Sequence, residues 1–491
     1  MITAVLVAVP LLVPLVSAGG ALVGGWRPRA AWANVAAAVS ILAAGIILGV
    51  RVTARTEFTA GHLLRADPLS ATMLIVIGAV ATLATWAGVD YLEAELADGK
   101  TTSEGARQYV ILVPLFLSAM VLAVEANNLG LVWTAVEATT IATAFLVGHR
   151  RTRQSLEATW KYVVVCSFGI TIAFLGTVVL YFASIHAGAS GSVALNLDTL
   201  SAVAAHLNPA VTRLAVGLLL IGFGAKAGLV PFHTWLADAH SQAPAPVSAL
   251  MSGVLLSVAF SILLRIKVIS DVALGLTYMR VGLLVSGLAT LVVAVSLLVG
   301  QSDFKRMFAY SSLEQMGLLA VAAAADTRLA VAGTLLVVAA HGIAKAILFI
   351  SAGQLQHAHG STLIADVTAV GARSPLLGTT LAVGVAGLLG FPPFAIFAGE
   401  LAMARGLSRA GLSLPLLSAS ALLLVGFVAI SRHTAAMLLG SEAPGSPSLR
   451  VTGPVAAPLV IGLAASVVLG TVGGPLVHLL IAAATSLGAK S

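Results

Sequence analysis

Four ionisable side chains lie near the middle of long apolar stretches, where a charge is costly. Glu137 and Lys226 lie in NLGLVWTAVEATTIATAFLVG and LLLIGFGAKAGLVPF, and Lys345 and Glu400 lie in LLVVAAHGIAKAILFI and FPPFAIFAGELAMARG. An unpaired charge at the centre of a bilayer costs roughly 3 kcal/mol on insertion scales, so such residues typically mark ion pathways or proton relays. Lysine, unlike arginine, can lose its proton when buried. These residue types therefore favour proton transfer.

Histidines accompany two of the lysines. His341 precedes Lys345 by four residues, so both side chains share one helix face and a proton can step between them, although a packing role for the histidine is the alternative. His233, Asp238 and His240 lie in PFHTWLADAH and are candidates for a channel mouth, a cap or a polar interface. Their spacing matches no usual metal-ligand pattern.

Other motifs that bind cofactors or catalyse reactions are absent from the sequence. It contains no G-x-x-x-x-G-K-[ST] phosphate loop, no G-x-G-x-x-G after a strand and no C-x-x-C. We therefore expect no metal, no cofactor and no catalytic centre, so the chain is not expected to be an enzyme by itself.

The composition excludes a soluble protein. Of 491 residues, 59% are hydrophobic and 9% are charged, whereas soluble domains carry about 25% charged residues. The net charge of +7 comes from scattered basic residues without a patch, which argues against nucleic-acid binding. The single Cys166 allows no intrachain disulfide.

Apolar runs long enough to span the roughly 30 Å hydrocarbon layer recur along the chain. They are continuous and lack strict alternation, which predicts an all-α polytopic membrane protein with about fourteen transmembrane helices. The expected spans are 2–24, 31–50, 69–89, 109–126, 128–148, 160–185, 211–239, 244–270, 278–300, 311–325, 329–356, 376–407, 413–439 and 454–485.

Two of these spans are interrupted by the same pattern, G-x-x-P-F. The breaks carry Gly228 and Pro231 in the seventh span, and Gly390, Pro392 and Pro393 in the twelfth. Proline removes a backbone donor and clashes with the preceding turn, so each span is expected to form two half-helices. Paired breaks predict two inverted repeats with ion-handling sites nearby, although such kinks are common in membrane helices.

A single integral membrane domain, 1–491, is therefore expected. Its approximate parts are N-terminal helices at 1–90, repeat halves at 109–270 and 278–440, and a C-terminal helix at 454–485. The first apolar run has no preceding basic residue and continues to Gly25, so it is interpreted as a spanning helix rather than a cleaved signal. The cluster HRRTR at 149–153 favours both termini on the non-cytoplasmic side of the cell inner membrane.

Several stretches resemble a known family. They are FGAKAGLVPFHTWLADAHSQAPAPVSALMSGVLL from Phe223, SDFKRMFAYSSLEQMG (302–317), HGIAKAILFISAGQL (341–355) and GFPPFAIFAGE (390–400). They are similar to the antiporter-like proton-pumping membrane subunits of respiratory complex I, the multisubunit sodium/proton antiporters and the membrane-bound nickel–iron hydrogenases. SLEQMG and EATWKY (157–162) look most like the F subunit of hydrogenase-4 and formate hydrogenlyase complexes.

The resemblance implies roles for the buried residues. Glu137 would pair with Lys226, and Lys345 would act with His341 beside it, while Glu400 would be the terminal group. Several relatives carry a lysine or histidine in the eighth span, where this sequence offers only Ser252 and Ser257. The link from Lys226 to His341 is therefore expected to depend on water and hydroxyl groups.

The implied function is a membrane subunit of a redox-driven complex that relays protons along these buried residues. Its expected partners are other membrane subunits of a hydrogenase, formate dehydrogenase or complex I-like assembly, together with the lipid bilayer and protons, or Na⁺. Two alternatives remain: a subunit of a multisubunit sodium/proton antiporter, and a structural membrane anchor for a hydrogenase or formate dehydrogenase arm.

Overall fold

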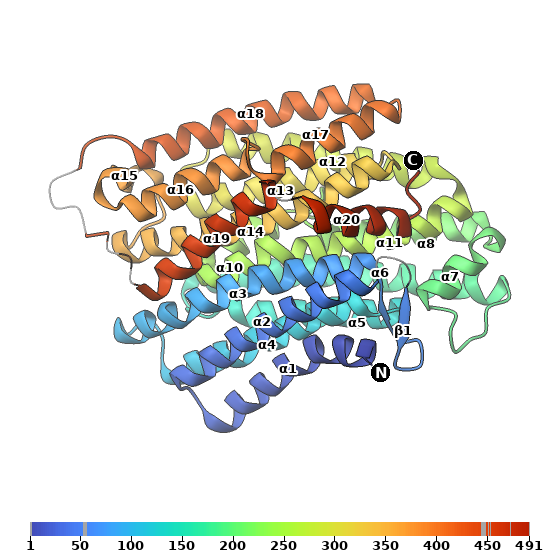
Figure 1. Cartoon of the computed structure of the whole chain (residues 1–491), viewed down its shortest axis with the longest axis horizontal. Coiled ribbons are helices and arrows are strands. Elements are labelled where there is room, and N and C mark those ends of the chain that lie inside the picture. Colours follow the sequence, from blue (N-terminus) through green and yellow to red (C-terminus); the bar gives the residue numbers. More distant parts are fainter. Residues whose placement is uncertain are drawn as a thin grey trace.

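The computed structural model describes residues 2–52, 56–442, 448–449, 451, 453–471 and 473–490. Its helices run side by side along the long axis of the molecule, and both ends of the chain lie at the same end of the bundle (Figure 1). We call this end, which holds Ile2 and Lys490, the terminal end. The opposite end, which holds the loops at 98–102 and 148–152, is the distal end.

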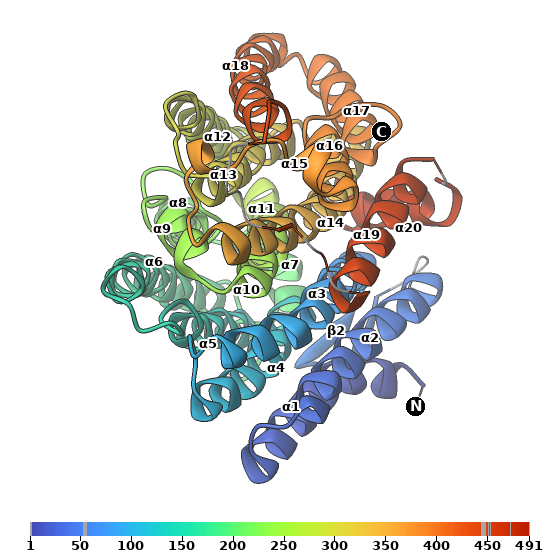
Figure 2. The same cartoon turned by 90° about the vertical axis from the view of Figure 1, so that its left-hand side faces the viewer.

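Twelve helices of the described chain are long and apolar enough to cross a membrane. They are α1 (Ile2–Gly24), α2 (Pro28–Arg51), α3 (Pro68–Ala97), α4 (Ser103–Glu125), α5 (Leu129–Val147), α6 (Arg153–His186), α8 (Pro209–Lys226), the helix Ala245–Leu274, α12 (Leu276–Val299), α14 (Arg328–His359), α18 (Ser413–Leu438) and α19 (Gly453–Thr471). Three more helices run alongside them (Figure 2): α13 (Phe304–Ala323), α16 (Pro375–Leu388) and α17 (Ala395–Arg409). The all-α polytopic fold is thus confirmed, and the predicted count of about fourteen is approximately right.

The helix Ala245–Leu274 is not uniform. It consists of α10 (Ala245–Leu250), one turn of π-helix η2 (Met251–Leu255) and α11 (Leu256–Leu274). Single π-helical turns often occur at functional sites. This turn lies within the span where the sequence offers serines in place of a basic residue.

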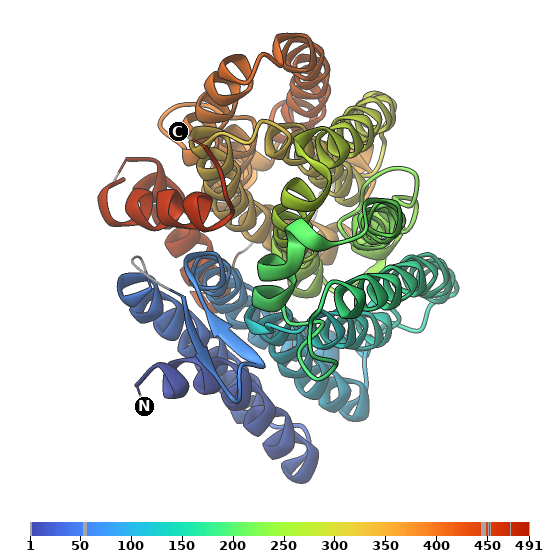
Figure 3. The ribbon, with the colours of Figure 1, turned by 90° about the vertical axis from the view of Figure 1, so that its right-hand side faces the viewer.

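The remaining elements are short. They are α7 (Leu197–Val203), η1 (Ala204–His206), α9 (Trp235–Gln242), η3 (Ile364–Asp366), α15 (Val370–Arg373), α20 (Gly474–Ser486) and the antiparallel hairpin of β1 (Glu57–Thr59) and β2 (Leu64–Ala66). Figure 3 shows the hairpin at the terminal end, beside α1. In place of the single helix expected at 454–485 the structure has two, since α19 ends at Thr471 and α20 begins at Gly474 with Pro475 in its first turn.

Side-chain caps fix where many helices begin. Asp67, Asn128 and Asp303, for example, lie just before α3, α5 and α13 and accept hydrogen bonds from the first free backbone amides. Such caps satisfy donors that have no partner within the helix. The Asp303 cap makes α13 begin seven residues before the predicted span at 311–325.

Glycines allow several helices to pack in backbone contact. A Cβ at Gly222 of α8 would lie 2.5 Å from the Ala173 nitrogen of α6, and one at Gly169 of α6 would lie 2.6 Å from the Ala225 Cβ. Gly287 of α12 faces Gly317 of α13 in the same way. Small residues at such crossings are typical of membrane helices, because association there depends on close packing.

Two crossings are interrupted where the sequence carries G-x-x-P-F. α8 ends at Lys226 and α9 begins at Trp235, and α16 ends at Leu388 and α17 begins at Ala395. Gly228 (φ +81°) and Gly390 (φ +69°) adopt the left-handed conformation that favours glycine. The peptide bonds preceding Pro231 and Pro393 are cis.

Each predicted repeat half contains five crossings, and the fourth of each is the broken one. An odd number of crossings makes the second half start from the opposite side of the membrane. The inverted relation between 109–270 and 278–440 stays a prediction, and the bundle itself is continuous through both halves (Figure 2).

Candidate functional site: a buried line of polar residues

Lys226 is the last residue of α8, directly before the first break. It is fully buried, and its Nζ donates to the Tyr162 hydroxyl at 2.6 Å and to Thr140 Oγ1 at 2.8 Å. The Tyr162 hydroxyl also lies 2.6 Å from Thr143 Oγ1. The ammonium group is therefore held by neutral hydroxyls of α5 and α6, a setting that tolerates either protonation state.

Glu137 lies on α5 one turn before Thr140 but makes no direct ion pair with Lys226. Its Oε1 accepts a 3.4 Å hydrogen bond from Ser167, and its Oε2 has no hydrogen-bond partner in the described chain. The two charges interact electrostatically without coming within 4.0 Å of each other. The expected Glu137–Lys226 contact is thus absent in this conformation, because the Lys226 ammonium group donates its hydrogen bonds to Thr140 and Tyr162 instead.

The π-helical turn meets α14 at a glycine crossing. A Cβ at Gly253 would lie 3.0 Å from the Gly342 carbonyl oxygen, and one at Gly342 would lie 2.9 Å from the Gly253 oxygen. Ser252 and His341 each precede one of these glycines, and the imidazole lies beside the Ser252 backbone. Ser252 Oγ lies 2.6 Å from Ser312 Oγ of α13. This pair of hydroxyl groups therefore connects the π-helical turn to α13 beside the crossing with α14.

His341 and Ser257 are buried without hydrogen-bond partners in the described residues. Both ring nitrogens of His341 and the hydroxyl of Ser257 lack a partner, and each residue is at most 1% exposed. A buried polar group without a partner costs free energy, so ordered water is the expected partner at both places.

Lys345 lies one helical turn beyond His341 on α14 and is also fully buried. Its Nζ donates to the Phe308 carbonyl oxygen at 2.7 Å and to the Ser311 hydroxyl, both on α13. No carboxylate of the described chain lies within ion-pair distance of it. Lys345 is therefore held, like Lys226, by neutral oxygens.

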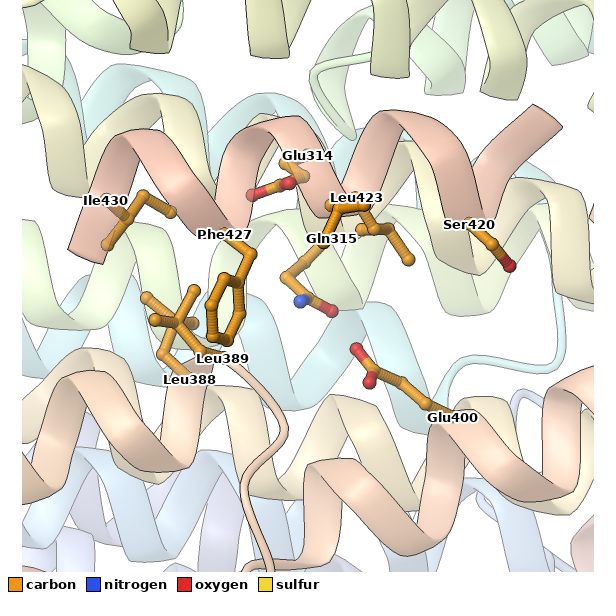
Figure 4. A pocket seen from close by; sticks show the side chains of 10 residues that line it. Glu314, Gln315, Leu388, Leu389, Glu400, Ser420, Leu423, Phe427 and Ile430 are labelled. Carbon is orange, nitrogen blue, oxygen red and sulfur yellow. The ribbon is translucent and has the colours of Figure 1, made fainter. Parts of the chain in front are cut away.

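Glu400 lies on α17, past the second break, and lines a cavity of about 210 Å³. Figure 4 shows its carboxylate pointing toward the amide of Gln315 across the cavity, with Glu314 nearby on the same helix α13. Two glycines make room for the acids. A Cβ at Gly390 would lie 2.6 Å from Glu400 Oε2, and one at Gly426 of α18 would lie 2.7 Å from the Glu314 carboxyl carbon.

The polar residues His233, in the first break, and Asp238 and His240, on α9 beyond it, do not join this line as one group. Asp238 forms ion pairs with Arg306 and with Lys161 (3.1 Å) at the distal end. His240 is buried, and its Nδ1 lies 2.6 Å from the Leu236 carbonyl oxygen. His233 is partly exposed, and its Nδ1 is buried without a partner in the described chain.

An ion-pair cluster fixes the terminal end. Asp67 caps α3 by accepting from the Ser70 amide at 2.7 Å, and it binds Arg265 of α11 (2.6 and 3.1 Å) and Arg65 (2.6 Å). Burial alone would raise the pKa of Asp67, but the two arginines and the Ser70 amide outweigh it and hold this pKa below its usual value.

A second cluster lies at the distal end. Arg150 pairs with the buried Glu95 of α3 at 2.7 Å, and Lys305 of α13 is fully buried with its Nζ 2.9 Å from the Ala243 carbonyl oxygen. Beside them, burial lowers the pKa of His149, in the α5–α6 connection, to about 4. These groups join the distal ends of four segments of the chain: α3, the α5–α6 connection, the α9–α10 connection and α13.

Sequence reasoning missed several of these residues. Glu314 was missed because the tenth span was expected to begin at 311, which left this carboxylate at a helix end. The signal was available, since Asp303 is a typical N-cap and places Glu314 near the middle of a twenty-residue helix. Glu125, buried at the end of α4 with no partner for either oxygen in the described chain, was also missed, because it lies at the end of the span expected at 109–126.

The buried line consists of groups that can take part in proton transfer. Among the described residues, no three His, Cys, Asp or Glu side chains lie close enough together to hold a metal ion. The buried lysines, hydroxyls, imidazole and carboxylates are instead groups that can both accept and release protons.

Comparison with known proteins gives the family. Residues 126–432 match the family described as NADH:quinone oxidoreductase/Mrp antiporter, TM. A "Hydrogenase-4 component F homolog" of Methylacidiphilum infernorum is 34% identical over 67% of this chain and 68% of the relative. The "F(420)H(2) dehydrogenase subunit N" of Methanosarcina mazei is 29% identical over 86% of this chain and 84% of the relative.

A solved structure has the same fold. One chain of the Mrp complex from a Dietzia species superimposes with a TM-score of 0.86, at 21% identity, over 99% of this chain and 98% of that chain. The family match covers more than half of the sequence, including every residue from Glu137 to Glu400 discussed above. The chain belongs to the NADH:quinone oxidoreductase/Mrp antiporter transmembrane family.

Proposed function

We propose that this chain is a proton-translocating membrane subunit of a redox-driven complex of the hydrogenase-4, formate hydrogenlyase or complex I type. Its partners are other membrane subunits, and it resides in the cell inner membrane with both termini on the non-cytoplasmic side. The observation that carries the proposal is the pair of fully buried lysines, Lys226 and Lys345, each held by neutral oxygens alone.

The proposed route starts at Lys226, continues through water near Ser257 and the hydroxyls of Ser252 and Ser312, and reaches His341 and Lys345. It ends at Glu400. The groups along this route can each accept and release a proton, and water supplies the partners that Ser257 and His341 lack in the described chain.

Glu137 acts as the switch in this proposal. When its carboxylate approaches Lys226, the ammonium form is stabilised, and when it withdraws toward Ser167, the buried lysine releases its proton more readily. The conformation described above is the separated one. A redox partner would drive the change, and moving one charge against 100 mV takes about 2.3 kcal/mol.

Pumping by the assembled complex in inverted membrane vesicles tests the proposal. Lys226→Ala and Glu137→Ala should each depress proton translocation while the redox activity and the amount of assembled complex stay near the wild-type level. Lys100→Ala and Glu104→Ala are matched controls, because both residues are exposed at the distal end and pair only with neighbours in sequence. Unchanged pumping in both test variants would contradict the proposed route.

A further inference from the structure

The cavity beside Glu400 contains a second carboxylate that the proposed route does not use. Glu314 of α13 lines it together with Gln315, Ser420 of α18 and the last residues of α16 (Figure 4). Glu314 is 4% exposed and lies in the middle of its helix. Its carboxylate occupies the space left by the missing side chain of Gly426.

Charge balance in this region is incomplete. The charged groups that interact with Glu314 are Lys345 of α14 and Glu400 of α17, and the parts of α16 and α18 that line the cavity contribute no titratable side chain. Lys345 interacts with Glu314, and Glu314 interacts with Glu400, so this region holds one ammonium group and two carboxylates. In a low-dielectric interior, one uncompensated negative charge remains, and taking up one positive charge relieves it.

The cavity is also lined by more hydrogen-bond acceptors than donors. Ionised carboxylates accept hydrogen bonds only, and so does the Gln315 amide oxygen, which is buried (4% exposed) and has no partner in the described chain. The hydroxyl of Ser420 is the one lining side chain, apart from the Gln315 NH₂ group, that can donate. A protonated carboxyl group or a hydronium ion supplies a further donor to this acceptor-rich set.

Lys345 is connected to the cavity through one helical turn. Its ammonium group contacts Ser311 of α13, and Glu314 and Gln315 follow Ser311 by three and four residues on the same helix face. A proton that leaves Lys345 therefore meets the Glu314 side of the cavity before it meets Glu400.

We infer that Glu314 and Glu400 form a binding site for one proton at the end of the relay. Lys345 gives up a proton to Glu314, which becomes a carboxylic acid, and Lys345 is protonated again from His341, so the three groups together gain one positive charge. Cavity water then carries the proton from Glu314 to Glu400, which restores the Glu314 carboxylate. The inference rests on the proposed function and adds to it a second acid, Glu314, that passes the proton to Glu400.

Three variants test the site in the assembled complex. Glu314→Gln should lower the ratio of protons pumped to electrons transferred by about tenfold or more, as expected for loss of a proton-transfer group. Glu314→Asp should restore part of it. Gly426→Ala should also lower pumping, because its Cβ displaces the Glu314 carboxylate, whereas Gly20→Ala in α1 meets nothing within 4 Å and is the matched control.

A spectroscopic readout separates proton binding from structural support. Infrared difference spectra of the reconstituted complex between two pH values should contain the band of a protonated carboxyl group, and both Glu314→Gln and Glu400→Gln should remove it. The double variant, which carries both Glu314→Gln and Glu400→Gln, should pump as well as the single variant that pumps less, since paired residues act as one unit.

The outcomes distinguish the inference from the proposed function. If Lys226→Ala abolishes pumping while Glu314→Gln leaves both the pumping ratio and the carboxyl band unchanged, the Glu314 site is refuted and the relay stands. If neither variant affects pumping, the proposed function itself fails. The assignment of the ligand as a proton would be overturned if pumping were absent in sodium-free medium and appeared only when Na⁺ was added.

Discussion

The contact between α6 and α8 positions Lys226, and Gly222→Ala tests it directly. A Cβ at Gly222 would lie 2.5 Å from the Ala173 backbone nitrogen and 2.6 Å from the Gly169 carbonyl oxygen. These are backbone atoms of α6, which cannot rotate away, so the helices must separate. Lys226 lies one turn further along the same face of α8, and its 2.6 Å contact with Tyr162 of α6 should therefore be lost.

The expected loss of stability in Gly222→Ala can be measured against a second glycine substitution in the same helix. Overpacking of this kind costs about 1–3 kcal/mol. Gly224 is the matched control, because its added Cβ would meet Leu229 at an ordinary 3.7 Å. Both substitutions gain about 1 kcal/mol of helix propensity. The free energies of unfolding of the two variants should therefore differ by about 1–3 kcal/mol.

Two measurements decide the outcome. Denaturant unfolding of the purified protein in mild detergent should show that Gly222→Ala is the less stable variant, and vesicle assays should show that it alone pumps poorly. Equal stability and equal pumping in Gly222→Ala and Gly224→Ala would refute the claim that this helix contact holds Lys226 in place.

Three other predictions concern residues at the relay and at the two ends of the bundle. Tyr162→Phe removes the hydroxyl that Lys226 and Thr143 share and should cut pumping about tenfold to a hundredfold, since a hydrogen bond to a charged group is worth about 1.5–3 kcal/mol. Tyr181→Phe on the same helix is the control. Asp67→Ala leaves Arg265 buried without its partner and should lower the free energy of unfolding by about 3–5 kcal/mol. Because the pKa of Asp67 is lowered in the folded state, its stabilising contribution is present above the unfolded pKa and should fade as pH falls, a loss that Asp67→Ala should no longer show in acid titrations. Burial lowers the pKa of His149 to about 4, so the unfolded state takes up this proton at a higher pH than the folded state. The free energy of unfolding should therefore decrease below about pH 6.5, by about 1–2 kcal/mol at pH 5. His149→Gln should remove this part of the pH dependence.

Most of the fold could be predicted from hydropathy, because each crossing must bury a continuous apolar run. The two helix breaks could also be predicted from the sequence, since glycine and proline impose their conformations locally. The beginning of α13 was misplaced because Lys305 and Arg306 look like loop residues in sequence, whereas the structure buries Lys305 against a backbone carbonyl.

The site was predictable where it consists of charges and unpredictable where it consists of hydroxyls. Lys226, Lys345 and Glu400 stand out in apolar sequence, but Thr140, Tyr162 and Ser311 resemble the many polar residues that pack membrane helices. Their contacts join residues 34 to 86 positions apart. Only the packing of α5, α6 and α8, and of α13 with α14, brings them to the lysines.

The position of ordered water in the assembled complex tests the central claim most directly. A high-resolution density map should show water molecules that join Lys226 to the Ser252–Ser312 pair and Lys345 to the Glu314–Glu400 cavity, with His341 and Ser257 as hydrogen-bond partners. Apolar side chains filling these gaps in every redox state, without water between the buried lysines, would contradict proton conduction along this line.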